Sequence, residues 1–405
     1  MRLVTQSAVS CEVRPVQSGS DMRRFRELPG LLYSSDPCGV RPLKMLQDAV
    51  LDRKRHPFYN NGQGAVAEFF IAVDRATGRP VGRIGAIIDN RHNELARRQD
   101  PDHELGGQFG FFDCVNSPQV AQALIGAAAD WLRQRGVKHM LGPASPSQSY
   151  DYGLLIEGHQ CPHRFLLSYH PAYYAALLEG CGLSKAKDLL SLSGDLNDPT
   201  CRTLIEQFIA RTATMQARSS VNVTFRPINM RKYRQDARIF GKVLNDALED
   251  HFGHSPITER EWQLITDSLR PFVNPDFILL AEQDGEPIGL TIGVPDLNEI
   301  IGRLRLRFGL LETLEFLLRS WRSKPQCISV IVAGVNRKYS KFGVAPMLIG
   351  QLVRNLLAHK VRFVNAHQVL EDNHPILDPL LRHGFQADRR HRVYQLALSE
   401  ASDQV

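Results

Sequence analysis

Apolar residues along this chain gather in short β-rich runs and in longer amphipathic stretches. In residues 69–89, FFIAVDRATGRPVGRIGAIID, an apolar run meets a glycine-containing turn and leads into a second apolar run. Residues 277–296, FILLAEQDGEPIGLTIGVPD, follow the same pattern, and both segments contain a G-x-P-[VI]-G stretch. Two apolar runs joined by a short turn are typical of a β-hairpin. The pattern therefore predicts one hairpin in each half of the chain.

A second pair of matching segments follows the hairpins in the same order. Residues 115–140 resemble residues 335–364, with Leu-Ile-Gly in the helical part of each, although the first segment is four residues shorter at the helix start. Both halves then continue to a His-Pro, a Leu-Leu pair and a Gly-Leu or Gly-Phe. Ordered matches of this kind indicate an internal duplication. Since strands precede long amphipathic helices in each half, we expect an α/β or α+β fold with mixed sheets.

The length of the chain fits two domains. It has 405 residues, of which 43% are apolar and 23% charged, and single domains usually have about 100 to 200 residues. We expect the linker near residues 196–220, where Asn-Asp-Pro indicates a turn or helix start and residues 217–220 a loop. The predicted domains are residues 1–200 and 201–405.

Composition narrows the functional classes only in part. The excess of 49 Lys+Arg over 43 Asp+Glu gives a formal charge of +6 and a pI near 8.9, which favours anionic partners without choosing among them. Seven scattered cysteines with no C-x-x-C pair indicate neither a disulfide framework nor a zinc site, so we expect a reducing cytosol and no metal. Neither a signal-peptide apolar segment nor a run of about 18 apolar residues is found, which predicts a cytoplasmic protein and leaves peripheral membrane contact open.

Residues 327–359 read as a strand, a basic loop and a helix. The apolar run CISVIVAGV precedes NRKYSKFGVAP, and the amphipathic MLIGQLVRNLLAH follows. Backbone N–H groups at a helix start are unsatisfied and lie at the positive end of the helix dipole, so a pyrophosphate can bind there. Gly343 allows close backbone approach, and Arg337, Lys338 and Lys341 add positive charge. The alternative is a basic surface turn before a helix.

The basic loop resembles motif A of the GNAT N-acyltransferase superfamily, whose loop reads Q/R-x-x-G-x-G/A. Gly343 and Ala345 match the motif, whereas Ser340 occupies its first position. The resemblance implies two tandem GNAT-like domains, of which the C-terminal one retains the loop for the pyrophosphate of acyl-CoA. The expected acyl-CoA contacts in the strand and loop are Ala333, Val335, Arg337, Lys338, Ser340, Lys341, Phe342, Gly343, Val344 and Ala345.

The first half has VNSPQ at the corresponding place, with neither a glycine nor a basic residue. We therefore expect a degenerate N-terminal domain that shapes the acceptor pocket or braces the second domain. Its polar stretch SPSQSYDYGLLIEGHQCPHRF, followed by SYHPAYY, offers aromatic and acidic groups to an amine. The expected substrate contacts are Tyr150, Asp151, Tyr152, His159 and Tyr173.

GNAT chemistry, implied by the resemblance, is the direct attack of a neutral amine on a thioester. A base removes the ammonium proton, and a main-chain N–H within residues 333–335 polarises the thioester carbonyl. In the segment QVLEDNHP that ends the next strand, Glu371 is the preferred base, His367 is the second candidate, and Asn373 resembles the motif-B asparagine of the family. The alternative is that Glu371 or Asp372 only caps the following helix.

The tyrosine acid that GNAT proteins often carry four residues before a Gly-Phe is Leu380 in this chain. A CoA thiolate can leave without that acid, or Tyr394 takes its role.

Over most of residues 65–395 the chain resembles a bacterial tandem-GNAT family of sphingolipid synthesis, the bacterial ceramide synthases. The resemblance is carried by GQFGFFDCVNSPQVAQAL, MLGPASPSQSYDYGLLIEG, YHPAYYAALLEGCGLSKAKDL, VLEDNHP and HRVYQL, and it departs at His159-Gln160, where a Phe-Asp pair is expected. It implies an enzyme that joins a long-chain acyl group from acyl-CoA to the amine of a sphingoid base.

The segment IIGRLRLRFGLLETLEFLLRSWRSK, residues 300–324, combines apolar residues with a basic flank. This composition suits the headgroup boundary of an anionic bilayer. A core helix with solvated arginines is equally consistent. The residues concerned are Trp321, Arg303, Arg305, Arg307, Arg319, Arg322 and Lys324.

Two other functions stay open. One is acetyl-CoA-dependent N-acetylation of a small polar amine or a protein, and the other is a non-catalytic regulator that binds acyl-CoA. We expect no nucleic acid partner.

Overall fold

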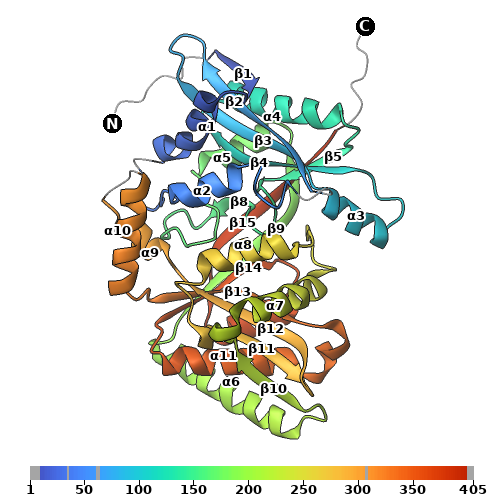
Figure 1. The fold of residues 1–405 in the computed structure, drawn as a ribbon, viewed down its shortest axis with the longest axis vertical. Coiled ribbons are helices and arrows are strands. Elements are labelled where there is room, and N and C mark those ends of the chain that lie inside the picture. The colour runs from blue at the N-terminus through green and yellow to red at the C-terminus, as the bar shows by residue number, and fades with distance from the viewer. Residues whose placement is uncertain (1–9, 34–35, 61–63, 306–308, 399–405) are drawn as a thin grey trace. The chain divides into compact units, whose positions relative to one another are not determined.

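The chain divides into two compact units. The computed structural model describes residues 10–33, 36–60, 64–305 and 309–398 (Figure 1). Unit 1 is Met1–Leu189 together with Arg389–Val405, and unit 2 is Leu190–Asp388. The chain thus leaves unit 1 along strand β9 (Ser184–Asp195) and returns to it along β15 (Gln386–Ala397). The prediction instead divided the chain at residue 200 and assigned the whole C-terminal part to the second domain.

Unit 1 is built on a mixed sheet with the strand order β1-β2-β3-β4-β5-β15. The first four strands are antiparallel neighbours, β4 and β5 are parallel, and β8 also pairs with β15. Its elements besides β9 and β15 are β1 (Cys11–Pro15), α1 (Gly19–Leu32), α2 (Lys44–Leu51), β2 (Val66–Asp74), β3 (Pro80–Ile88), α3 (Asn90–Gln99), β4 (Gly106–Cys114), α4 (Pro118–Arg133), β5 (His139–Gly142), β6 (Ala144–Ser145), β7 (Asp151–Tyr152), β8 (Leu154–Glu157) and α5 (Tyr173–Gly180).

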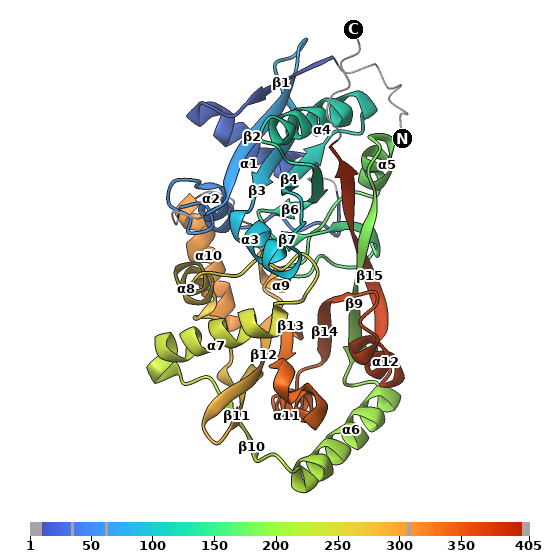
Figure 2. The ribbon, with the colours of Figure 1, turned by 90° about the vertical axis from the view of Figure 1, so that its right-hand side faces the viewer.

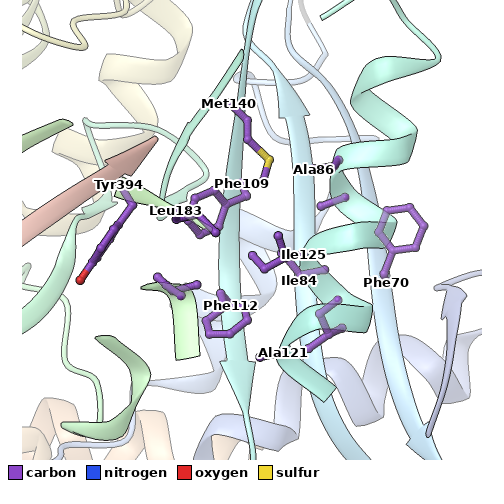
Figure 3. Close-up of a cluster of buried hydrophobic side chains, with 14 of the residues drawn as sticks. Phe70, Ile84, Ala86, Phe109, Phe112, Ala121, Ile125, Met140, Leu183 and Tyr394 are labelled. Carbon is purple, nitrogen blue, oxygen red and sulfur yellow. The ribbon is translucent and has the colours of Figure 1, made fainter. Parts of the chain in front are cut away.

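Helix α4 shows how the sequence builds the core of unit 1. The Ser117 side chain caps the helix by accepting a hydrogen bond from the Val120 N–H, and Pro118 occupies a first-turn position where its missing N–H costs nothing. Apolar residues then recur every three or four positions and are buried against β3 and β4 (Figure 3). The buried residues of α4 are Val120, Ala121, Leu124, Ile125, Ala128, Ala129 and Leu132.

Unit 2 repeats this plan with the strand order β9-β14-β13-β12-β11-β10. Strands β10 to β13 are antiparallel neighbours, and β13 and β14 are parallel. Its remaining elements are α6 (Pro199–Arg218), β10 (Val223–Pro227), η1 (Met230–Lys232), α7 (Tyr233–Leu248), α8 (Glu259–Leu269), η2 (Pro275–Phe277), β11 (Ile278–Gln283), β12 (Glu286–Pro295), α9 (Asn298–Ile301), α10 (Gly309–Arg322), β13 (Cys327–Val335), η3 (Arg337–Phe342), α11 (Val344–Ala358), β14 (Phe363–Leu370) and α12 (His374–Arg382).

The shared order of elements confirms the predicted mixed α/β fold and the duplication. The two predicted hairpins are β2–β3 and β11–β12, and the two predicted strand–helix pairs are β4–α4 and β13–α11. The linker expected at residues 196–220 is wrong, because that segment forms the 20-residue helix α6. Asp198 caps this helix, Pro199 starts it, and Thr212 is buried where the helix packs on Gly350 of α11.

Candidate active site

Strands β13 and β14 separate part-way along their length, within unit 2 (Figure 2). They pair from Cys327 with Phe363 to Val330 with Ala366, and β13 then continues to Val335 paired only with β12. The β12–β13 register shifts at the same place, so that Ile331 is left out of the ladder. Backbone groups on the β14 side of β13 are therefore available to an extended ligand.

Burial along β13 changes at the point of separation. The first three residues of the strand are buried, whereas Ala333 is exposed and Val335 half-buried. In β14, Gln368 has a φ of +44°, an uncommon backbone conformation for a residue other than glycine, two residues after the last pair with β13. The two strands thus diverge in unit 2, and the predicted contacts Ala333 and Val335 lie on the part of β13 that is no longer paired with β14.

A basic turn follows β13 directly. The segment predicted as the phosphate loop forms the 3₁₀ helix η3, and the Asn336 side chain caps it by accepting a hydrogen bond from the Lys338 N–H. Arg337, Lys338 and Lys341 are exposed. The turn therefore concentrates positive charge at the entrance of α11.

Helix α11 begins immediately after Gly343, which has a φ of +71°. Its first internal hydrogen bond runs from the Met347 N–H to the Gly343 carbonyl at 3.3 Å. The N–H groups of Val344 and Ala345 precede that bond and point out of the helix start, and Pro346 has none. Gly343 has a second constraint, since a Cβ there would lie 2.8 Å from the Met215 sulfur of α6.

The turn after β14 carries the predicted acid–base residues. Glu371 is half-buried and Asp372 exposed, and Asn373 occupies the N-cap position of α12 without a capping hydrogen bond from its side chain. The N-cap position of α12 thus belongs to Asn373 and to neither Glu371 nor Asp372. His367 is half-buried within β14, so the structure brings both predicted base candidates to one strand and the turn that ends it.

The turn after α7 is a part of the site that the sequence analysis missed. Gly334 of β13 packs so closely on α7 that a Cβ at Gly334 would lie 2.8 Å from the Ala247 Cβ. Shortly after Ala247, Asp250 forms an ion pair with Arg337 of η3 at 2.7 Å. The turn that follows α7 therefore lies along the end of β13 and the start of the basic turn.

His251 lies in this turn and is half-buried. Burial lowers its pKa, and a hydrogen bond with the Phe252 backbone and the charge of Asp372 offset part of that effect. Since the Asp372 charge reaches His251, the turns after α7 and β14 approach one another in unit 2. No local signal marks this histidine, because the contact joins elements that are distant in sequence.

Two buried polar side chains adjoin the point where β13 and β14 separate. Ser329 and Asn365 face each other in the register and are fully buried. The Asn365 amide donates to the Ser193 hydroxyl at 3.0 Å, and that hydroxyl donates to Asp388 at 2.7 Å. Within the described residues, the Ser329 hydroxyl and the Asn365 side-chain oxygen have no hydrogen-bond partner, which is rare for buried polar groups in native proteins.

In unit 1 the corresponding separation of strands is filled by the chain itself. Strand β4 pairs with β5 only from Gly106 to Gln108. Beyond that point a Cβ at Gly110 would overlap the carbonyl group of Ala144, and the Phe111 N–H donates to the Ser145 hydroxyl at 2.7 Å. Strand β6 therefore occupies the place beside β4 that corresponds to the unpaired side of β13.

The five predicted substrate contacts, all in unit 1, differ in their surroundings. The Tyr150 ring packs edge-on against His56 with 5.5 Å between centroids. Tyr152 is buried, and the half-buried Tyr173 donates a hydrogen bond to the Cys114 carbonyl at 2.8 Å. These two tyrosines are thus held by the protein itself. The remaining two contacts are Asp151 and His159.

Asp151 and His159 are the polar groups of the five with unusual settings. Asp151 is solvent-exposed, yet desolvation by the surrounding protein raises its pKa to about 6, with Arg83 opposing the rise and Asp113 adding to it. The Nε2 atom of His159 is buried and, within the described part of the chain, lacks a hydrogen-bond partner. Desolvation thus brings the pKa of Asp151 closer to neutral pH than that of an ordinary aspartate.

Tyr394 is fully buried in the core of unit 1, near Phe109 and Leu183 (Figure 3). Its hydroxyl donates to Glu179 at 3.0 Å, and burial raises its pKa. These surroundings are those of a core residue and do not favour the acid role predicted for Tyr394.

Two buried histidines and a half-buried one should make unit 1 sensitive to acid. Burial lowers the pKa of His56 and His391 to about 4 and that of His170 to about 3, against 6.5 in the unfolded chain. The unfolded chain then binds protons that the folded unit excludes, so stability falls as the pH drops from 6.5 towards 4 and is unaffected above 6.5. The expected slope is about 1.4 kcal/mol per pH unit for each histidine.

Amide hydrogen exchange of β4 peptides over this pH range, corrected for the intrinsic rates, measures the effect. A His391→Asn variant should show a shallower dependence, whereas an exposed control, His374→Asn in unit 2, should leave the slope of unit 1 unchanged. Equal slopes in wild type and His391→Asn would contradict the prediction.

Comparison with known proteins places the chain in a class. No protein-family model matches it. A tandem GNAT protein from the clavulanic acid biosynthesis pathway superposes with a TM-score of 0.54 at 13% identity, over 97% of this chain and 100% of that one. A GCN5-related glucosamine N-acetyltransferase region of a fungal β-N-acetylglucosaminidase gives a TM-score of 0.53 at 14% identity, over 96% of this chain and 38% of that one. The fold is that of a tandem GNAT protein.

Sequence relatives define the family more narrowly. The chain is 31% identical over 333 residues to the bacterial ceramide synthase of Caulobacter vibrioides, which covers 81% of each protein. It is 30% identical over 390 residues to the protein YghO of Escherichia coli, which covers 95% of this chain and 94% of YghO. The chain therefore belongs to the tandem-GNAT acyltransferase family that includes the bacterial ceramide synthase, and it is an acyl-CoA-dependent N-acyltransferase.

The described residues show neither a bilayer-spanning helix nor a cluster of metal-ligating side chains. None of their helices combines the length and apolar character needed to cross a bilayer. No group of three or more His, Cys, Asp or Glu side chains in the described part of the chain is arranged to hold a metal ion.

Proposed function

We propose that the protein joins a long-chain acyl group from acyl-CoA to the amine of a sphingoid base, as a ceramide synthase. The observation that carries this proposal is the separation of β13 from β14, which leaves the end of β13 unpaired on that side just before a basic turn and a left-handed glycine, in a chain related to the Caulobacter enzyme. The relationship supports the acceptor class, and the separated strands with the basic turn support the donor.

Acyl-CoA would lie along β13 with its pyrophosphate at the start of α11. The N–H groups of Val344 and Ala345 would hold the phosphate oxygens, and the exposed side chains of Lys338 and Lys341 would neutralise their charge. The exposed Ala333 leaves room for the thioester, whose carbonyl would accept a hydrogen bond from a main-chain N–H of β13. Ser340, Phe342 and Asn373 remain proposed contacts at the edge of this site.

In the reaction, the amine nitrogen bonds to the thioester carbon, the carbon–sulfur bond breaks, and CoA leaves as a thiolate. An amine with a pKa near 10 is protonated in all but about one molecule in a thousand at pH 7, so a base must take its proton. We propose Glu371 as this base, with His367 of β14 and His251 of the turn after α7 as the other candidates.

The filled separation in unit 1 supports one acyl-CoA site per chain. Because β6 occupies the place beside β4, we propose no acyl-CoA site in unit 1, where Asp151 is the most suitable group for an ammonium. Tyr150 and His159 would flank that position, and Tyr152 and Tyr173 would support it from the core. Both long-chain substrates partition into lipid, so the enzyme would work in the cytoplasm at the inner face of the membrane.

Coenzyme A release tests this function. Purified protein is given acetyl-CoA or palmitoyl-CoA, each with and without a detergent-solubilised sphingoid base. Release only with palmitoyl-CoA and the base supports the proposal. Release from acetyl-CoA with polar amines would favour an acetyltransferase, and binding without release would favour a regulator.

A further inference from the structure

Helix α10 turns its apolar face to the solvent. Its six large apolar residues other than Phe316 recur at intervals of one, three or four positions and form one stripe along the helix. The exposed fractions are 89% for Leu310, 53% for Leu311, 55% for Leu314, 46% for Leu317, 50% for Leu318 and 92% for Trp321.

The opposite side of α10 faces unit 2. Glu312 and Phe316 are each 3% exposed, and the Phe316 ring packs on Phe272 with 5.1 Å between centroids. A surface helix of a soluble protein usually buries its apolar stripe and exposes its charges. In α10 the arrangement is reversed, and an exposed apolar patch of this kind marks an interaction site.

The exposed charged side chains around the apolar stripe are all basic. Arg303 and Arg305 precede the helix, and Arg322 and Lys324 end it, all four exposed. The two acidic residues of the helix point away from the stripe, since Glu312 is buried and Glu315 bonds to Arg319 and to the Arg305 N–H. Arg307, the remaining predicted basic residue, lies outside the described residues. An apolar stripe with an exclusively basic rim suits an anionic bilayer.

We propose that this surface, Leu310, Leu311, Leu314, Leu317, Leu318 and Trp321 with its basic rim, docks the enzyme on an anionic membrane. The leucines enter the acyl boundary, Trp321 lies at the headgroup level, and the arginines and Lys324 contact lipid phosphates. A second copy of the chain is a poorer occupant, because two such faces would bring their basic rims together. The inference rests on the proposed function only in that lipid substrates give the docking its purpose.

Vesicle sedimentation tests the surface without catalysis, because the vesicles hold no substrate. Wild type should bind vesicles of phosphatidylcholine and phosphatidylglycerol in equal parts and bind phosphatidylcholine alone at least about tenfold more weakly, with the difference shrinking at high salt. Leu314→Glu with Trp321→Glu should reduce binding to the anionic vesicles by about 100-fold. Arg303→Gln with Arg305→Gln should reduce it about tenfold and remove most of the lipid selectivity.

The matched control is Leu264→Glu, an exposed leucine of α8 outside the surface. It should bind vesicles as wild type does, and circular dichroism should show all variants folded. Equal vesicle binding by wild type and Leu314→Glu/Trp321→Glu would overturn the proposal. It would also be overturned if wild type were a dimer that does not bind vesicles and Leu314→Glu/Trp321→Glu were a monomer, because the surface would then join two copies of the chain.

The readout is separate from the proposed function. CoA release from detergent-solubilised substrates should be unchanged in Leu314→Glu/Trp321→Glu. A wild-type protein that releases no CoA but binds anionic vesicles would contradict the proposed ceramide synthase function and support the docking surface. A wild-type enzyme that is active but does not bind vesicles would support the function and contradict the docking surface.

Discussion

Gly343→Asp abolishes acyl-CoA binding in the arrangement proposed for unit 2, and we expect at least a 1,000-fold loss of affinity. Three effects act together. Aspartate is strained at a φ of +71°, its Cβ would lie 2.8 Å from the Met215 sulfur, and its carboxylate would repel the pyrophosphate at the start of α11. Isothermal titration with CoA, which carries the pyrophosphate without an acyl chain, measures the loss.

Gly285→Asp is the matched control for this substitution. Gly285 lies in the β11–β12 hairpin of the same unit, has a φ of +84°, and has no atom within 4 Å of an added Cβ. Backbone strain should lower the free energy of unfolding of the Gly285→Asp variant by about 1 kcal/mol, and the variant should bind CoA with wild-type affinity. Unchanged CoA affinity in Gly343→Asp, with circular dichroism showing both variants folded, would remove the phosphate loop from the proposal.

Much of the fold could be predicted because its signals are local. Each hairpin is contained in about twenty consecutive residues, and the strand, basic turn and helix of residues 327–358 follow one another directly. In such segments the hydrophobic period and the turn residues specify the structure without reference to the rest of the chain. The left-handed conformation of Gly343 is a local property of the same kind.

The features that escaped prediction depend on contacts between distant segments. Asp198 and Pro199 favour a helix start, but only packing against α11 shows that α6 belongs to unit 2 and is no linker. Tyr394 follows the β14–α12 region in sequence, yet its part of β15 pairs with β5 and lies in the core of unit 1. A sequence pattern near each residue does not contain this information.

The candidate site shows the same division. Lys338, Lys341 and Gly343 were found because they share one turn, whereas the turn that contains His251 lies along β13 only because α7 contacts β13. The position of β6 beside β4 is likewise not predictable from the local sequence, since Ser145 must meet Phe111 across the sheet. Chemistry carried by one turn can be predicted from sequence, and chemistry assembled from several elements requires the fold.

Glu371→Gln separates acyl-CoA binding from proton transfer. We expect unchanged CoA affinity, because Glu371 follows β14 and lies outside the basic turn, and a fall in kcat of about 100-fold to 10,000-fold, the usual contribution of a general base. Asp378→Asn is the matched control, since it removes an exposed carboxylate from the adjacent helix α12 and should leave kcat within about twofold of wild type. Single-turnover measurement of CoA release avoids any limit set by product dissociation.

His251→Gln and His367→Gln decide between Glu371 and the other candidates. If Glu371 is the base, each histidine variant should retain at least about a tenth of the activity, and a near-wild-type rate in Glu371→Gln would contradict the assignment. A base at His251 would place the acid limb of kcat/KM below pH 6.5, because burial lowers the pKa of that imidazole, and the limb would vanish in His251→Gln. The pH profile and the loss of rate together identify the general base. If His251 only stabilised the turn after α7, His251→Gln would lower the rate without removing the acid limb of the pH profile.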